Sequence, residues 1–109
     1  MPPVIVHPRY YVPTAYPKDP DAEVWYGLEV GSHAPGSSLV EVVWSVSGGD
    51  GALALIDQQD GVAVDGYETV NRVMLSGGTP HQTYRLTCAA TFNHNRYLHL
   101  SFNLPVWHL

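Results

Sequence analysis

The ten residues Thr83–Phe92 constrain the fold most strongly, because their side chains alternate in character with a period of two. One face of this stretch carries Tyr84, Leu86, Cys88, Ala90 and Phe92. This pattern is typical of a strand with one face in a core and the other toward water. A cluster of turn formers precedes it, so Tyr84 lies at the strand's entry, where a tyrosine can bury its ring and return its hydroxyl to the turn backbone. The stretch therefore predicts a small β-sandwich.

Four further stretches predict strands of the same sandwich. They are Val24–Val30, Leu39–Ser47, Thr69–Leu75 and Leu98–Val106. Trp25 and Tyr26 fall on opposite faces of the first, and Trp44 lies on the apolar face of the second. We expect Trp44 to be the central core tryptophan, packed with Tyr84, Leu86 and Phe102.

Two polar segments predict turns between strands. Asn93–Arg96, with the sequence NHNR, is rich in residues that tolerate left-handed backbone, as a hairpin turn requires. Asp57–Asp60, with the sequence DQQD, separates the short apolar stretches Ala52–Ile56 and Gly61–Val64. We expect these two stretches to form a small hairpin. No segment shows helical periodicity of useful length.

The N-terminal segment differs in composition from the rest of the chain. Residues 1–20 hold six of the nine prolines, which exclude a helix and favour extended backbone. Its apolar and aromatic content is high for a disordered tail. Two interpretations stay open: an edge strand of the chain's own sandwich, or an arm that docks on a neighbouring subunit. We therefore divide the chain into residues 1–18, an extended N-terminal arm or edge strand, and residues 19–109, the sandwich.

Charge and cysteine content limit the classes of function. Charged residues make up 14% of the chain, and the net charge is -5. No basic stripe occurs, so we expect no nucleic-acid partner. The sequence shows neither a signal peptide nor a transmembrane span, so we expect synthesis in a cytoplasm and no membrane partner. Cys88 is the single cysteine, and its phase in the strand predicts a core residue rather than a reactive thiol.

The sequence offers little support for catalysis or for a cofactor. Six histidines invite a metal hypothesis, but their spacing matches no metal-binding motif. They are His7, His33, His81, His94, His99 and His108. A gathering of His81, His94 and an acid is the weaker alternative to loop and surface histidines. Two acidic sets lack EF-hand spacing and are read as solvated turn acids: Asp19, Asp21 and Glu23, and Asp57, Asp60 and Asp65. We expect no metal, no cofactor and no enzyme.

Exposed aromatic residues allow two interpretations. Flat aromatic faces suit sugar rings, so a carbohydrate-binding platform is one alternative. Aromatic residues are likewise enriched in protein interfaces and in cores, and we favour this second interpretation. The residues concerned are Tyr10, Tyr11, Tyr16, Trp25, Tyr26 and Trp107.

Several of these motifs together resemble a known family. The motif positions are Asp19–Asp21, Glu29, Trp44, Leu75–Thr79 and Tyr84–Thr87. In this order they resemble small immunoglobulin-like virion proteins of tailed bacteriophages, commonly labelled fibre–tail adaptors. The resemblance covers roughly residues 19–106. The chain departs from the family pattern in its longer proline- and tyrosine-rich arm and in the turn NHNR, both of which lie on expected contact surfaces.

The resemblance implies a structural component of the virion, made in the cytoplasm of a bacterial host. We expect an all-β, immunoglobulin-like antiparallel β-sandwich with an extended Pro/Tyr-rich N-terminal arm. Its partners would be tail and fibre subunits, contacted by several copies in a symmetric assembly. We expect Tyr10, Tyr11, Tyr16 and Trp107 to be the anchors for these partners. A capsid decoration protein and a carbohydrate-binding module are the alternatives.

Overall fold

The computed structural model describes residues 4–6, 14–30, 37–64 and 67–108 of the 109-residue chain. The described residues form seven strands and no helix, and none of them belongs to a helix that could span a membrane. The strands are β1 (Val4–Val6), β2 (Val24–Glu29), β3 (Leu39–Ser47), β4 (Leu53–Val64), β5 (Tyr67–Gly77), β6 (Thr83–Phe92) and β7 (Arg96–Pro105).

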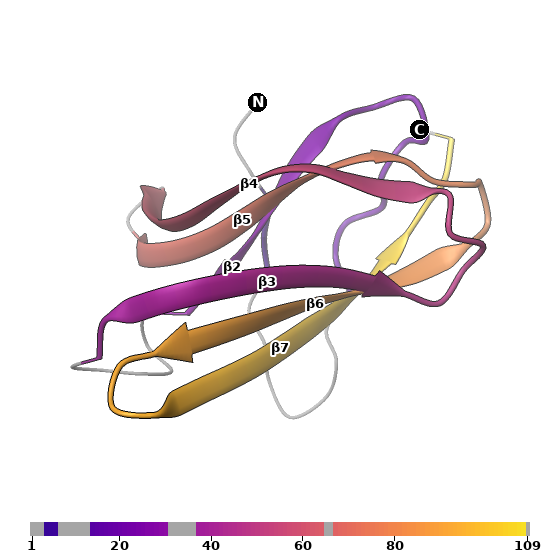
Figure 1. The fold of residues 1–109 in the computed structure, drawn as a ribbon. Helices are drawn as coiled ribbons and strands as arrows, with labels where there is room; N and C mark the ends of the chain where they lie inside the picture. Colours follow the sequence, from indigo (N-terminus) through magenta and orange to yellow (C-terminus); the bar gives the residue numbers. More distant parts are fainter. Residues whose placement is uncertain (1–3, 7–13, 31–36, 65–66, 109) are drawn as a thin grey trace.

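The strands form two sheets, which lie one above the other in Figure 1. One sheet has the order β1-β2-β5-β4, and the other has the order β3-β6-β7. All neighbouring strands are antiparallel except β1 and β2, which pair in parallel through Val4–Val6. The expectation of an all-β fold built from two packed sheets is therefore confirmed.

The core lies between the two sheets and is built from the alternating faces that the sequence predicts. Strand β6 has the predicted bounds, and its inward residues from Tyr84 to Phe92 are all buried. Phe102 on β7 occupies the centre: Tyr26 stacks on it at 5.9 Å between ring centroids, and Trp44 meets it edge-on at 6.3 Å. The predicted core residues are thus confirmed, with apolar side chains from both sheets excluding water.

The hairpin between β6 and β7 has the predicted turn. Strand β6 ends at Phe92 and β7 begins at Arg96, so that the connection is three residues long. His94 and Asn95 have φ angles of 59° and 57°, in the left-handed region. Asn93 fixes the hairpin to the start of β3, since its backbone N–H donates to Ser38 O at 2.9 Å and its side-chain oxygen accepts from Ser38 N at 3.0 Å.

The hairpin expected from Ala52–Ile56 and Gly61–Val64 is wrong. Residues Leu53–Val64 form one continuous edge strand, β4, which pairs with β5. The polar segment DQQD is exposed along this edge, so its polarity reflects solvent contact rather than a turn. The pairing register shifts between Gln59 and Val62, at Gly61, whose φ is +62°. Bulges therefore absorb the irregular pattern without ending the strand.

Buried Asn71 on β5 holds this bulge in place. Its side-chain oxygen accepts a hydrogen bond from Gly61 N at 3.0 Å, and its amide donates to the sulfur of Cys88 at 3.6 Å. Cys88 is fully buried, as predicted, and burial raises its pKa to about 11. The thiol is therefore protonated at neutral pH and acts as a core group.

Tyr84 forms the predicted corner at the entry to β6. Its ring is buried, and its hydroxyl accepts from Thr79 N at 2.9 Å and donates to Asp50 at 2.6 Å. Asp50 also accepts from the Thr79 hydroxyl and from Ala52 N, at 3.1 Å in the latter case. Glycine is required at position 49, since a Cβ there would lie 2.5 Å from the Tyr84 ring. The corner thus joins the β3–β4 turn to the loop before β6.

Replacing Tyr84 by phenylalanine tests the corner. The change keeps the buried ring but removes both hydroxyl hydrogen bonds, so we expect Tyr84→Phe to lower the free energy of unfolding by about 1–2 kcal/mol. Urea denaturation measures the effect. Tyr97→Phe serves as the control, because the Tyr97 side chain is exposed. Equal stabilities of the two variants would contradict the role of the corner.

The corner also predicts a dependence on acid. Hydrogen bonds from Thr79, then from Tyr84 and Ala52, lower the pKa of Asp50 from 3.8 to about 2. A carboxylate with a lowered pKa in the folded state contributes stability above its unfolded pKa and loses it as the pH falls through the folded value. We therefore expect the difference in stability between the wild type and Asp50→Asn to narrow from about pH 4 to about pH 2. Denaturation at several pH values measures it, and a constant difference would contradict it.

Candidate docking surface at the chain ends

Residues from both ends of the described chain lie side by side along β7. Thr14–Lys18 run parallel to the end of β7, with bridges from Thr14 to Asn103 and from Lys18 to Val106. The backbone N–H groups of Ala15 and Lys18 donate to Asn103 O and Pro105 O at 2.8 and 3.0 Å. Trp107 N in turn donates to Lys18 O at 3.0 Å. These hydrogen bonds fix residues 14–18 and 103–107 relative to each other.

Two of the predicted anchors are exposed on this fixed backbone. The Tyr16 side chain is 71% exposed and that of Trp107 is 44% exposed. The buried Tyr26 hydroxyl donates to Tyr16 O at 3.2 Å, and burial raises the pKa of Tyr26 to about 12, so the donor is retained at neutral pH. The ring of Trp107 meets His81 edge-on, with 5.1 Å between centroids. We call Tyr16, His81 and Trp107 the chain-end surface.

The other two predicted anchors, Tyr10 and Tyr11, lie outside the described residues. Of the further aromatic candidates, Tyr26 belongs to the core. Trp25 is half-buried, with the Arg72 guanidinium 4.7 Å from its ring centroid. Of the aromatic residues that the sequence predicts as contact candidates, Tyr16 and Trp107 are thus the two that are exposed among the described residues.

A buried lysine braces the backbone beneath this surface. Lys18 is 1% exposed, and its ammonium group donates to Asp19 O at 2.8 Å and to Gly77 O at 2.9 Å. Desolvation lowers the pKa of Lys18, while the charges of Asp19, Asp21 and Glu23 raise it. The three acids therefore act as counter-charges to a buried ammonium, a role that the sequence alone does not indicate.

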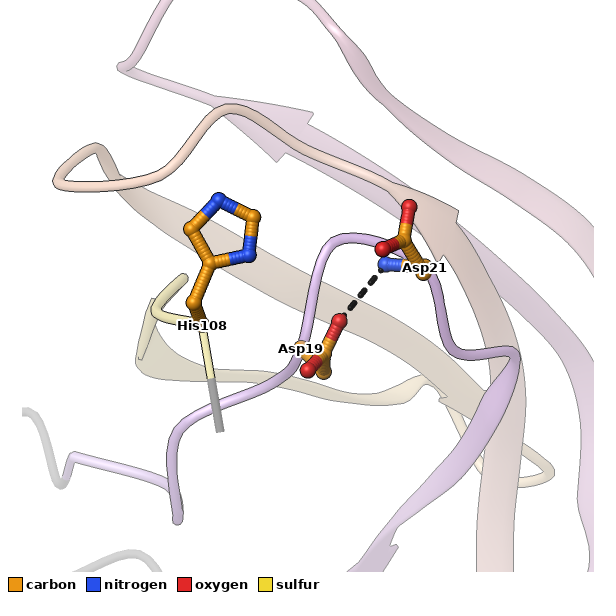
Figure 2. Close-up of side chains that lie close together, drawn as sticks. All are labelled: Asp19, Asp21 and His108. Carbon is orange, nitrogen blue, oxygen red and sulfur yellow. Dashed lines mark hydrogen bonds between the residues drawn. The ribbon is translucent and has the colours of Figure 1, made fainter.

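Two of these acids and a histidine also form a cluster, shown in Figure 2. Ligand atoms of Asp19, Asp21 and His108 all lie within 4.8 Å of one another. Asp21 N donates to the Asp19 carboxylate at 2.9 Å, and that bond shapes the turn. Two carboxylates and an imidazole are donors that a divalent cation accepts. The cluster could not be predicted from sequence spacing, because His108 lies near the other end of the chain from the two acids. The hydrogen bond from Trp107 N to Lys18 O places His108 beside the acidic turn.

The alternative metal site, in which His81 and His94 gather with an acid, is wrong. His81 precedes β6 and His94 follows it, so the length of this strand separates them and they do not gather. His94 and His99 are exposed on the β6–β7 hairpin and on β7. His7 and His33 lie outside the described residues.

Comparison with protein families decides the assignment of the chain. Residues 18–105 match the model of the family described as podophage GP4 fiber-tail adaptor protein gp77. The chain belongs to this family. The matched range covers strands β2 to β7 and Lys18, whereas β1, Tyr16 and Trp107 lie outside it. The searches of curated proteins and of solved structures find no match. Membership of the fibre-tail adaptor family confirms the resemblance and implies a virion component that contacts other virion proteins.

The brace beneath the chain-end surface is tested by replacing Lys18 with methionine. This change keeps an aliphatic chain but leaves the carbonyls of Asp19 and Gly77 without their donor. We expect a loss of about 1–3 kcal/mol in the free energy of unfolding. Arg85→Met, at an exposed position on β6, is the matched control and should change stability by less than about 0.5 kcal/mol. Denaturant titration compares them, and equal losses would refute the brace.

Proposed function

We propose that this protein is a non-enzymatic adaptor of a tailed phage virion that joins tail fibres to the tail by protein–protein contacts. The observation that carries the proposal is the pair of exposed aromatic side chains, Tyr16 and Trp107, on hydrogen-bonded backbone in a member of a fibre-tail adaptor family. The low charge content supports it, because extensive contact with other chains favours surfaces with few charges.

Fixed aromatic groups suit this role for an energetic reason. Binding costs conformational entropy for every group that becomes ordered in the interface. The carbonyl of Tyr16 already accepts from the Tyr26 hydroxyl, and Trp107 N already donates to Lys18 O, so less backbone entropy remains to be lost at both residues. Large aromatic residues also dominate the energies of interfaces. The family description concerns fibre and tail, which favours this role over head decoration and over sugar binding.

We further propose that the sandwich is immunoglobulin-like. The strand orders β1-β2-β5-β4 and β3-β6-β7 correspond to the ABED and CFG sheets of an immunoglobulin constant domain. The tyrosine corner at Tyr84 and the core tryptophan on β3 support the same assignment. The parallel pairing of β1 with β2 is a departure from the antiparallel sheets of that fold.

The N-terminal arm and the copy number complete the proposal. Val4–Val6 pair with β2 and Thr14–Lys18 pack on β7, so both of these segments are held by the chain's own sandwich. Tyr10 and Tyr11, which lie between them in the sequence, would contact neighbouring subunits. Several copies in a symmetric assembly would repeat each contact, and repetition holds an assembly without covalent links.

Alanine substitutions at the chain-end surface test the function. We expect Tyr16→Ala and Trp107→Ala each to weaken binding to tails that lack this protein by about 30-fold, the loss typical of a buried aromatic anchor. Tyr97→Ala is the matched control, since Tyr97 is 67% exposed at the start of β7, the end of the strand farthest from Trp107. Quantitative reconstitution measures binding. Unchanged binding by both variants, or glycan binding abolished by them, would contradict the adaptor role.

A further inference from the structure

Strand β3 ends its sheet on the side of the sandwich away from the chain-end surface. In the order β3-β6-β7, its described neighbour is β6, whereas the last part of the β7 edge, from Asn103 onward, is covered by Thr14–Lys18. Figure 1 shows β3 along the near side of the molecule, below β4 of the other sheet. The pairing of β3 with β6 is regular from Glu41 to Ser47 after one shift near Leu39. An edge this regular presents backbone groups at the spacing that a further strand needs.

The direction of the free backbone groups follows from one contact. Val42 O accepts a hydrogen bond from the Gln58 side chain on β4 at 3.3 Å, so this carbonyl points away from β6. Backbone groups of an antiparallel pair alternate between the partner strand and the opposite side. Trp44 and Val46, two and four residues further along, therefore direct their N–H and C=O groups to the same open side, while Val43 and Ser45 bond to β6.

From Glu41 to Ser47, strand β3 also lacks the features that usually protect an edge. Natural edge strands are blunted by lysine, proline, bulges or short length. The nine residues of β3 contain neither lysine nor proline, and Val40 and Val43 expose 66% and 52% of their side chains. Strand β4 of the other sheet, by contrast, has register shifts at three points. The edge of β3 is thus suited to pairing and that of β4 is not.

The charges on this side indicate the kind of partner. Strands β3 and β4 together carry three acids, Glu41, Asp57 and Asp60, and no lysine or arginine. Asp60 lies beside the edge, because the Gln58 amide that bonds Val42 O also donates to Asp60 at 3.0 Å. Pairing β3 of two copies would bring two such acidic sets together, which is unfavourable. A segment carrying lysine or arginine gains from the same charges.

We propose that the edge of β3 receives an extended, basic segment of a different virion protein as an added strand. The Gln58 side chain occupies one acceptor of this edge and gives it up when the strand binds. The proposal uses the virion location that family membership implies, and its surface is separate from Tyr16 and Trp107. The two surfaces would allow one adaptor to contact two different partners.

Hydrogen exchange of backbone amides tests strand addition, comparing the isolated protein with the same protein in purified virions. We expect exchange at Val42, Trp44 and Val46 to slow by about tenfold or more in virions, with little change at Val43 and Ser45, which are already bonded to β6. This alternation is specific to an added strand. Equal slowing at all five amides, as from burial of a face, or no slowing at all, would overturn the proposal.

Charge reversal tests the nature of the partner. We expect Glu41→Lys, and likewise Asp57→Lys, to remove the added protection in virions. Tyr97→Lys adds positive charge at an exposed position of β7, away from β3, and should retain it. Melting temperatures confirm that the variants fold. Protection that persists in both the Glu41→Lys and the Asp57→Lys variant would contradict a basic partner.

Two further outcomes separate this proposal from others. The same alternating protection in a dimer of the isolated protein would assign the edge to a second copy and would also contradict the proposal. Tyr16→Ala should leave the protection of β3 unchanged in the virions that form, so failure of this proposal is distinguishable from failure of the chain-end surface.

Discussion

The hydrogen bonds between residues 14–18 and β7 determine where the proposed docking surface lies. They bring a segment near the start of the chain against a segment near its end, and they hold Tyr16 and Trp107 in place although both side chains are exposed. The ammonium group of Lys18 supports the same region from below by binding the carbonyls of Asp19 and Gly77. Burying a charge is costly unless it is paired and hydrogen-bonded. The two carbonyls supply the hydrogen bonds, and the charges of Asp19, Asp21 and Glu23 favour the ammonium, which gives the acidic turn before β2 a structural reason.

Much of the sandwich could be predicted from the sequence because its strands obey one rule. In β6 and β7 a single face is buried, so apolar and polar residues alternate and the bounds are clear. Tyr84 and Trp44 could be placed because a large aromatic residue next to a turn, or in mid-strand, has few environments that satisfy it. The left-handed turn of His94 and Asn95 was likewise predictable from residue type.

Other features could not be predicted, because distant residues determine them. The sequence of β4 predicts a hairpin, because its bulges and its polar residues resemble a turn locally. Buried Asn71, ten residues beyond Gly61, stabilises the bulge that keeps the strand continuous. The cluster of Asp19, Asp21 and His108 depends on pairing between the two ends of the chain. The buried position of Lys18 is the least predictable, because a lysine beside three acids normally indicates solvent exposure. In each case a tertiary contact outweighs the local pattern.

The same acids that would attract a basic strand also keep copies of this protein apart. An unprotected edge strand is a risk during synthesis, when many identical chains are present and no other partner has yet bound. Lysine on the edge would reduce that risk but would repel a basic partner as well. Acids beside the edge discriminate: they disfavour β3 of an identical copy and favour a positively charged segment. The uncharged side chain of Gln58 on β4 also occupies Val42 O at this edge. Displacing it costs little free energy, because its amide exchanges one hydrogen-bond acceptor for another. Specificity at this edge would thus come from charge, whereas at the chain ends it would come from the fixed positions of two aromatic rings.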